Sequence, residues 1–122
     1  MRPSVRGMLC IFAVLVSLAI ALKPQVAMAG GGDVARGKAL FEGKGGCVSC
    51  HGAGGRGDGP AARMLVPPPK SLADPKVKAK SDEDLMKAIQ EGRPGTGMVG
   101  FKGLLSEQDI RDLVVYVRSL NK

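Results

Sequence analysis

Aromatic residues, histidine and cysteine are scarce in this 122-residue chain. It contains no tryptophan, one tyrosine and three phenylalanines, together with one histidine and three cysteines. A nucleic-acid surface that interleaves aromatic and basic side chains is therefore not indicated. We also find no strand pattern, no internal repeat, and no general base or nucleophile of the kind that an enzyme uses. The sequence predicts an all-α protein without catalytic residues.

The first 29 residues have the composition of a signal peptide. Arg2 and Arg6 precede a charge-free apolar run at residues 8–22, and an A-x-A cleavage site follows at residues 27–29. The run is shorter than the roughly twenty residues that a membrane-spanning helix needs. We expect cleavage before Gly30 and export to the periplasm. The alternative is an uncleaved leader that tethers the protein to the membrane.

Cleavage would leave residues 30–122 as a single small domain of 93 residues. The domain would hold 15 basic and 11 acidic residues, a net charge of +4 instead of the +7 of the whole chain. A domain of this size rarely builds a sufficient core without a disulfide, a metal or another staple. Its two cysteines, Cys47 and Cys50, belong to one short motif, so a disulfide is not the expected staple.

Cys47, Cys50 and His51 form a C-x-x-C-H motif, which is typical of covalent haem attachment. Residues three apart on a helical turn project from the same face, so both thiols can reach the vinyl groups of one porphyrin. His51 comes next in the sequence and can offer an imidazole nitrogen to the iron. We therefore predict one covalently attached haem c, bound by these three residues.

Two other interpretations of the motif fit the chain less well. A dithiol redox pair of the thioredoxin kind needs a βαβ context and a cytosolic address. A structural zinc ion needs four ligands, whereas the chain offers one histidine and one further cysteine, Cys10, in the leader. A dithiol role remains the alternative to haem attachment.

The first predicted helix of the domain covers residues 33–44, with Asp33 as its N-cap. Gly37 and Phe41 are four residues apart and therefore share a face of this helix. A glycine at that place either lets another helix approach closely or only weakens an exposed turn.

Glycine and proline dominate residues 52–69, of which only residues 61–65 can form a short helical turn. The stretch lacks the pattern of a phosphate-binding loop. Backbone without Cβ can approach a large flat ligand, so we expect this loop to lie against a haem edge. A second helix should begin at Ser81 and end at Gly92, and a last amphipathic helix should begin at Ser106.

Together these features resemble a class I c-type cytochrome over residues 33–122. The resemblance rests on four features in order: Gly37-x-x-x-Phe41, the C-x-x-C-H motif, Gly97-Met98-x-x-Phe101, and the last amphipathic helix. It implies a small all-α class I cytochrome c fold, with helices packed around one haem. It also implies that the first and last helices cross near Gly37 and Tyr116.

Three methionines remain after cleavage: Met64, Met86 and Met98. The resemblance implies that Met98 is the second axial ligand, opposite His51. Met64 is the rival, although its place only thirteen residues after His51 makes the opposite face hard to reach. Met86 is expected in the core. Related proteins commonly carry proline directly after the ligating methionine, where this chain has Val99.

The resemblance further implies that a proline carbonyl accepts the other ring N–H of the ligating histidine, and Pro60 is the candidate. With His51 and Met98 on the iron, both axial positions are filled and the thioether favours the ferrous state. Reaction is then confined to gaining and losing one electron.

We therefore expect a soluble electron carrier that shuttles electrons between respiratory or other redox partners outside the cytoplasmic membrane. A basic patch can steer it onto an acidic partner, with six candidate residues: Lys76, Lys78, Lys80, Lys87, Arg93 and Lys102. A solvated surface is the simpler interpretation of these residues. The alternative functions are a haem-bearing relay subunit of a larger oxidoreductase and a haem gas-binding sensor.

Overall fold

The computed structural model describes residues 31–120, and helices are the only regular elements in that part of the chain. They are α1 (Val34–Glu42), α2 (Val48–His51), η2 (Ala62–Met64), α3 (Pro75–Lys78), α4 (Asp82–Glu91) and α5 (Glu107–Ser119). A single bridge pairs Lys102 with Leu105. The predicted all-α fold is confirmed, while the predicted signal peptide at residues 1–29 lies outside the described residues. None of the helices within residues 31–120 has the length and apolarity needed to cross a membrane.

The predicted N-caps of the three longest helices are confirmed. The Asp33 carboxylate accepts a hydrogen bond from the Arg36 N–H at 2.9 Å, and the Ser81 hydroxyl accepts one from the Asp84 N–H at 3.0 Å. Ser106 and Asp109 form a reciprocal capping box at the start of α5. Each cap satisfies N–H groups that have no partner within the helix.

Helix α3 was not predicted from the sequence, because four residues are too few for an apolar periodicity. The residues at the start of α3 nevertheless favour a helix. The Asp74 carboxylate accepts a hydrogen bond from the Lys76 N–H at 2.7 Å, and Pro75 occupies the first helical turn. Proline is favoured there because its missing N–H would have no helical partner.

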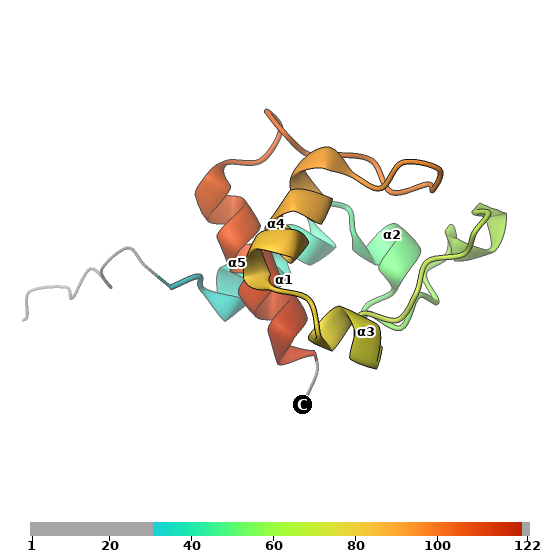
Figure 1. Ribbon diagram of the computed structural model, residues 1–122, viewed down its shortest axis with the longest axis horizontal. Helices are drawn as coiled ribbons and strands as arrows, with labels where there is room; N and C mark the ends of the chain where they lie inside the picture. The colour runs from blue at the N-terminus through green and yellow to red at the C-terminus, as the bar shows by residue number, and fades with distance from the viewer. Residues whose placement is uncertain (1–30, 121–122) are drawn as a thin grey trace, which may run out of the picture.

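The central packing contact is the crossing of α1 and α5, which is the most extensive contact between two elements (Figure 1). A Cβ atom at Gly37 would lie 2.8 Å from the Tyr116 Cβ and closer still to the Asp112 carbonyl oxygen. The Phe41 and Tyr116 rings meet edge to face with centroids 5.2 Å apart. Gly37 is therefore a packing glycine, as the resemblance implied, and not a weak point of an exposed turn.

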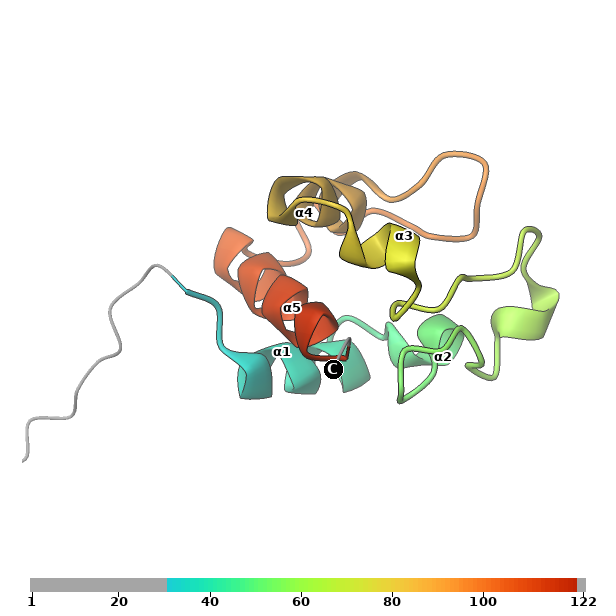
Figure 2. The same ribbon diagram turned by 60° about the horizontal axis from the view of Figure 1, so that its bottom comes forward.

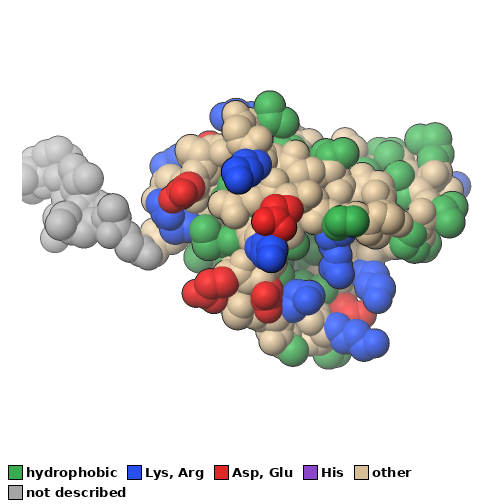
Figure 3. Space-filling view, turned by 45° about the horizontal axis from the view of Figure 1, so that its top comes forward, with side chains coloured by type: hydrophobic (Ala, Val, Ile, Leu, Met, Phe, Trp, Pro, Cys, Tyr) green, Lys and Arg blue, Asp and Glu red, His purple; other side chains and the backbone are tan. Residues whose placement is uncertain are grey.

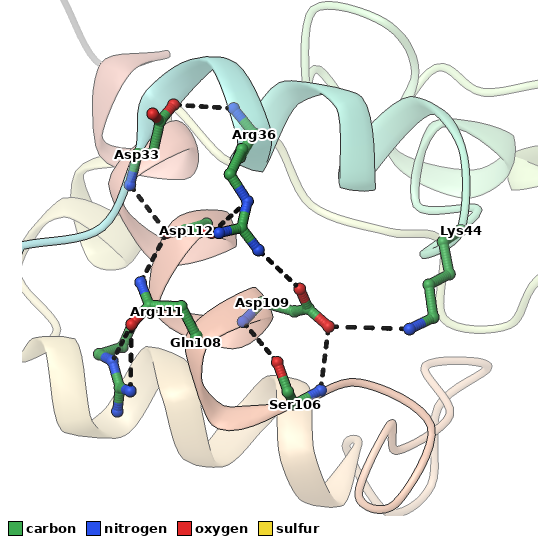
Figure 4. Close-up of polar contacts among 8 residues, drawn as sticks. All are labelled: Asp33, Arg36, Lys44, Ser106, Gln108, Asp109, Arg111 and Asp112. Carbon is green, nitrogen blue, oxygen red and sulfur yellow. Dashed lines mark hydrogen bonds and ion pairs between the residues drawn. The ribbon is translucent and has the colours of Figure 1, made fainter. Parts of the chain in front are cut away.

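A buried carboxylate connects the start of α1 to α5. The Asp112 side chain is fully buried and accepts hydrogen bonds from the Asp33 N–H at 2.8 Å and from Gln108 Nε2 at 2.9 Å. Its second oxygen makes no hydrogen bond and lies 3.2 Å from Arg36 Nε in an ion pair. Arg36 also pairs with Asp109, as Figure 4 shows. These partners offset the desolvation of the buried charge.

The other face of α5 holds α4. Figure 2 shows α5 between α4 above and α1 below. Phe41, Leu105, Ile110, Leu113 and Tyr116 form the buried cluster, and Met86 and Ile89 of α4 pack against it. The core position predicted for Met86 is thus confirmed. The Arg118 guanidinium donates hydrogen bonds to the carbonyls of Lys78 and Lys80 and to the Asp82 carboxylate, so it fixes the entry to α4.

We expect Gly37→Ala to lower the free energy of unfolding of the holoprotein by about 2 kcal/mol or more, because helix backbones would have to separate. Denaturant unfolding followed by circular dichroism measures the change. Gly54→Ala is the control, because a Cβ at Gly54 meets only Arg56 side-chain atoms at 3.7 Å or beyond. Equal stabilities for the two variants would contradict the close crossing.

Candidate haem site

The C-x-x-C-H motif forms one helical turn in α2. The His51 N–H donates to the Cys47 carbonyl at 2.9 Å, which closes the turn around the motif. Cys47 and Cys50 are free thiols, and both are half-buried. Burial raises the pKa of the Cys47 thiol, an effect that its own main-chain hydrogen bond opposes. The two thiols are unpaired and fixed three residues apart, as attachment to one porphyrin requires.

The His51 ring is half-buried beside the core. Its centroid lies 6.4 Å from that of Phe41, and its Nδ1 atom is buried without a hydrogen bond of good geometry. Burial lowers the pKa of His51, while a main-chain interaction with Lys70 acts in the opposite direction. The lowered pKa favours neutral imidazole, the form that binds a metal. The donor set of α2 therefore fits the predicted haem.

The predicted role of the Pro60 carbonyl stays a prediction, because the His51 Nδ1 atom has no hydrogen-bond partner within residues 31–120. The main chain of Lys70 lies close enough to His51 to act on its pKa. The path of the loop gives the reason. The Leu72 N–H donates to the Gly55 carbonyl at 2.6 Å, and a Cβ at Gly57 would overlap the Pro69 carbonyl. These contacts bring the segment around Lys70 beside α2, which sequence spacing alone cannot show.

The glycine-rich loop after α2 folds back onto the motif itself. The Gly57 N–H donates to the His51 carbonyl at 2.8 Å, and the Gly59 N–H donates to the Cys50 carbonyl at 3.1 Å. A Cβ at Gly59 would lie 2.6 Å from the Val48 carbonyl oxygen. The close backbone approach that the glycines permit is therefore an approach to α2. It satisfies carbonyls at the end of this short helix.

Met98 belongs to the loop between α4 and α5. The loop returns to the end of α4, where the Phe101 and Lys102 N–H groups donate to the Ile89 and Gln90 carbonyls, both at 3.0 Å. Figure 2 places this loop at the top and α2 at the bottom of the same end of the molecule. Gly97 packs tightly against Leu65, which follows η2. The loop thus reaches the segment downstream of the haem motif.

The two candidate methionines differ in their surroundings. Met98 is half-buried in its loop, whereas Met64 is 78% exposed at the end of η2. Val66, close to Met64 along the chain, is 91% exposed. The structure thus gathers Cys47, Cys50 and His51 on α2 and keeps both methionines on separate segments.

A sequence model of the cytochrome c family matches residues 34–121. Cytochrome c6 of Synechocystis sp. is 31% identical over 86 residues, which cover 70% of this chain and 63% of the relative. The cbb3-type cytochrome c oxidase subunit FixP of Bradyrhizobium diazoefficiens is 37% identical over 91 residues, which cover 74% of this chain and 28% of the relative. The chain therefore spans less than two thirds of the length of either curated relative.

Solved structures show the same likeness. The reducing HAO-like protein complex of Kuenenia stuttgartiensis matches with a TM-score of 0.66 and 33% identity, over 73% of this chain and 44% of that one. The KustC0563 c-type cytochrome matches with a TM-score of 0.57 and 30% identity, over 70% of this chain and 98% of that one.

The site and the fold thus define a c-type cytochrome. The chain belongs to the cytochrome c family, which the match over residues 34–121 shows. Its cofactor is covalently bound haem c, for which Cys47 and Cys50 are suitably placed.

We expect the double variant Cys47→Ser/Cys50→Ser to lose covalent haem, because no thioether bond can then form. Mass spectrometry of the denatured chain should show one haem on the native protein and none on the variant. Ser49→Ala is the control, since this exposed residue lies within the motif but carries no thiol. Haem retained by the denatured double variant would contradict the assignment.

Proposed function

We propose that the chain is a one-electron carrier in which His51 and Met98 are the axial ligands of haem c. When bound, the haem supplies an iron that alternates between the ferric and ferrous states. Cys47 and Cys50 hold it covalently, and His51 presents a neutral imidazole to it. The observation that carries this proposal is the C-x-x-C-H motif closed into one turn of α2, with the histidine pKa lowered by burial.

Met98 supplies the second ligand in this proposal. Its thioether is soft and favours the ferrous state, so it raises the reduction potential. With both His51 and Met98 bound, the iron would have no position left for oxygen or a substrate. The chain would accordingly transfer electrons and catalyse no reaction of its own. The leader-like composition of residues 1–29 supports action outside the cytoplasmic membrane, in the periplasm.

We expect Met98→Ala to abolish the weak near-red absorbance band that methionine sulfur bound to ferric haem produces. The reduction potential should fall, because the thioether no longer favours the ferrous state. Absorbance spectra and a redox titration of the holoprotein measure both effects. Met64→Ala and Met86→Ala are the matched controls, and both should keep the band.

Loss of the band in Met64→Ala instead would transfer the ligand role to Met64. A native protein that lacks the band and binds carbon monoxide readily when reduced would favour gas binding over electron transfer. The same spectra therefore distinguish the proposal from ligation by Met64 and from gas binding.

The surface suggests how a partner is recognised. We define the basic surface as Lys76, Lys78, Lys80, Lys87, Arg93 and Lys102. Within residues 31–120 none of these cations takes part in an ion pair. Figure 3 shows Lys and Arg side chains gathered on one part of the molecule, with some Asp and Glu among them. Lys80, Lys87 and Arg93 share a shallow recess with Asp84 and Glu91. We propose that an acidic redox partner docks here.

Charge reversal tests this docking. Lys87→Glu should slow association with the redox partner about threefold or more at low ionic strength, with the difference vanishing at high salt because the charges are screened. Stopped-flow electron transfer measures the rates. Lys38→Glu on α1 is the control for the change in net charge. Rates that do not depend on salt would contradict docking by charge.

A relay subunit of a larger oxidoreductase is the second candidate function. Two similar proteins are named as parts of assemblies, an oxidase subunit and an HAO-like complex. Met64 and Val66 also present exposed apolar side chains that a permanent partner could cover. Stable co-purification with a larger subunit at high salt would favour the relay, whereas a freely diffusing domain would favour the carrier.

A further inference from the structure

Thr96 closes the loop that contains Met98. Its hydroxyl donates a hydrogen bond to the Arg93 carbonyl at 2.7 Å and accepts one from the Met98 N–H at 3.1 Å. The Thr96 N–H also donates to the Arg93 carbonyl at 3.1 Å, and the Arg93 N–H donates to the Met98 carbonyl at 3.0 Å. Both main-chain groups of Met98 are therefore held, and one of them is held by a side chain.

The base of the loop is fixed independently of Thr96. A Cβ at Gly92 would lie 2.5 Å from the Met98 carbonyl oxygen, and one at Gly100 would lie 2.6 Å from the Gln90 carbonyl oxygen. Backbone therefore packs directly on backbone where the loop leaves and rejoins α4. Substitution of Thr96 should leave this anchoring in place.

The apex of the loop has less to restrain it. Gly95 has φ of +75° and no atom within 4 Å of an added Cβ, and Gly97 follows Thr96. Glycine leaves the backbone many accessible conformations. Val99 follows Met98, and valine lacks the ring that fixes φ in proline. Hydrogen bonds are therefore an important part of the restraint on Met98.

We propose that Thr96 is a positioning residue that holds Met98 in place to bind the haem iron. This inference rests on the proposed ligation by Met98. The hydroxyl acts through the main chain of Met98 and uses its single proton on Arg93. It supplies by hydrogen bonding the local order that a proline would supply by its ring.

Competition with free imidazole measures how firmly Met98 is held. Imidazole binds the ferric iron when the thioether leaves, so its apparent affinity rises with the population of the open form. Thr96→Val keeps the branched shape but leaves the Met98 N–H without its partner. We expect the dissociation constant for imidazole to fall about tenfold in this variant, from the typical contribution of one or two hydrogen bonds. The near-red band should be lost at lower imidazole concentration to the same extent.

Two further variants make the result specific. Thr96→Ser retains the hydroxyl and can keep both of its hydrogen bonds. It should therefore bind imidazole within about threefold of the native value. Ser71→Ala is the matched control, because the Ser71 hydroxyl accepts a hydrogen bond from the Ala73 N–H in a different turn. It should leave the imidazole affinity unchanged.

The outcomes separate this inference from the proposed function. A native protein without the near-red band overturns both. A native protein with the band, but with equal imidazole affinity in Thr96→Val, overturns the role of Thr96 alone. Hydrogen exchange of the Met98 amide in the native holoprotein gives a test that does not depend on variant folding. Protection of this amide supports the inference, and exchange at the rate of an unstructured chain overturns it.

Discussion

The close approach of α1 to α5 at Gly37 determines where both halves of the haem site lie. From α1 the chain passes through one tight turn into α2, so the crossing sets the place of the C-x-x-C-H motif. On the other side, α5 fixes the entry to α4 through Arg118, and the last carbonyls of α4 hold the loop that contains Met98. The candidate ligands come from distant parts of the sequence and depend on one contact between two helices.

The core and the haem site share side chains. The Phe41 ring meets both Tyr116 of α5 and His51 of α2, and Cys47 packs against the same buried cluster. A domain this small buries little apolar surface by itself. Its two described cysteines are free, so no disulfide joins them. A covalently bound haem c would add apolar packing beside this cluster and would stabilise a domain that has few other means of doing so.

Much of this architecture follows from local signals. The caps at Asp33, Ser81 and Ser106 are readable because a short polar side chain bonds to the backbone two or three residues later. The haem motif can likewise be recognised from the sequence, because its three haem-binding residues lie within one turn. The prediction of Met98 as a ligand, by contrast, depended on the order of elements along the whole chain and not only on the residues beside it.

Other features depend on contacts that no spacing reveals. The main chain of Lys70 lies close enough to His51 to act on its pKa, because the glycine-rich loop folds back on α2 before it turns away. No pattern in the sequence marks Thr96 as a positioning residue. Its role depends on the loop closing between Arg93 and Met98, and that closure exists only in three dimensions.

The start of the domain has a consequence for how it can be joined to other proteins. Gly32 packs against Arg111 and Val115 of α5, and the Asp33 N–H donates a hydrogen bond to Asp112. The chain therefore runs beside α5 before it enters α1. In Figures 1 and 2 this point of entry lies at the end of the molecule away from α2. A module fused before residue 31 would attach at a distance from the haem motif. The same unit is therefore suited to recombination into longer chains, with the end that carries α2 left uncovered.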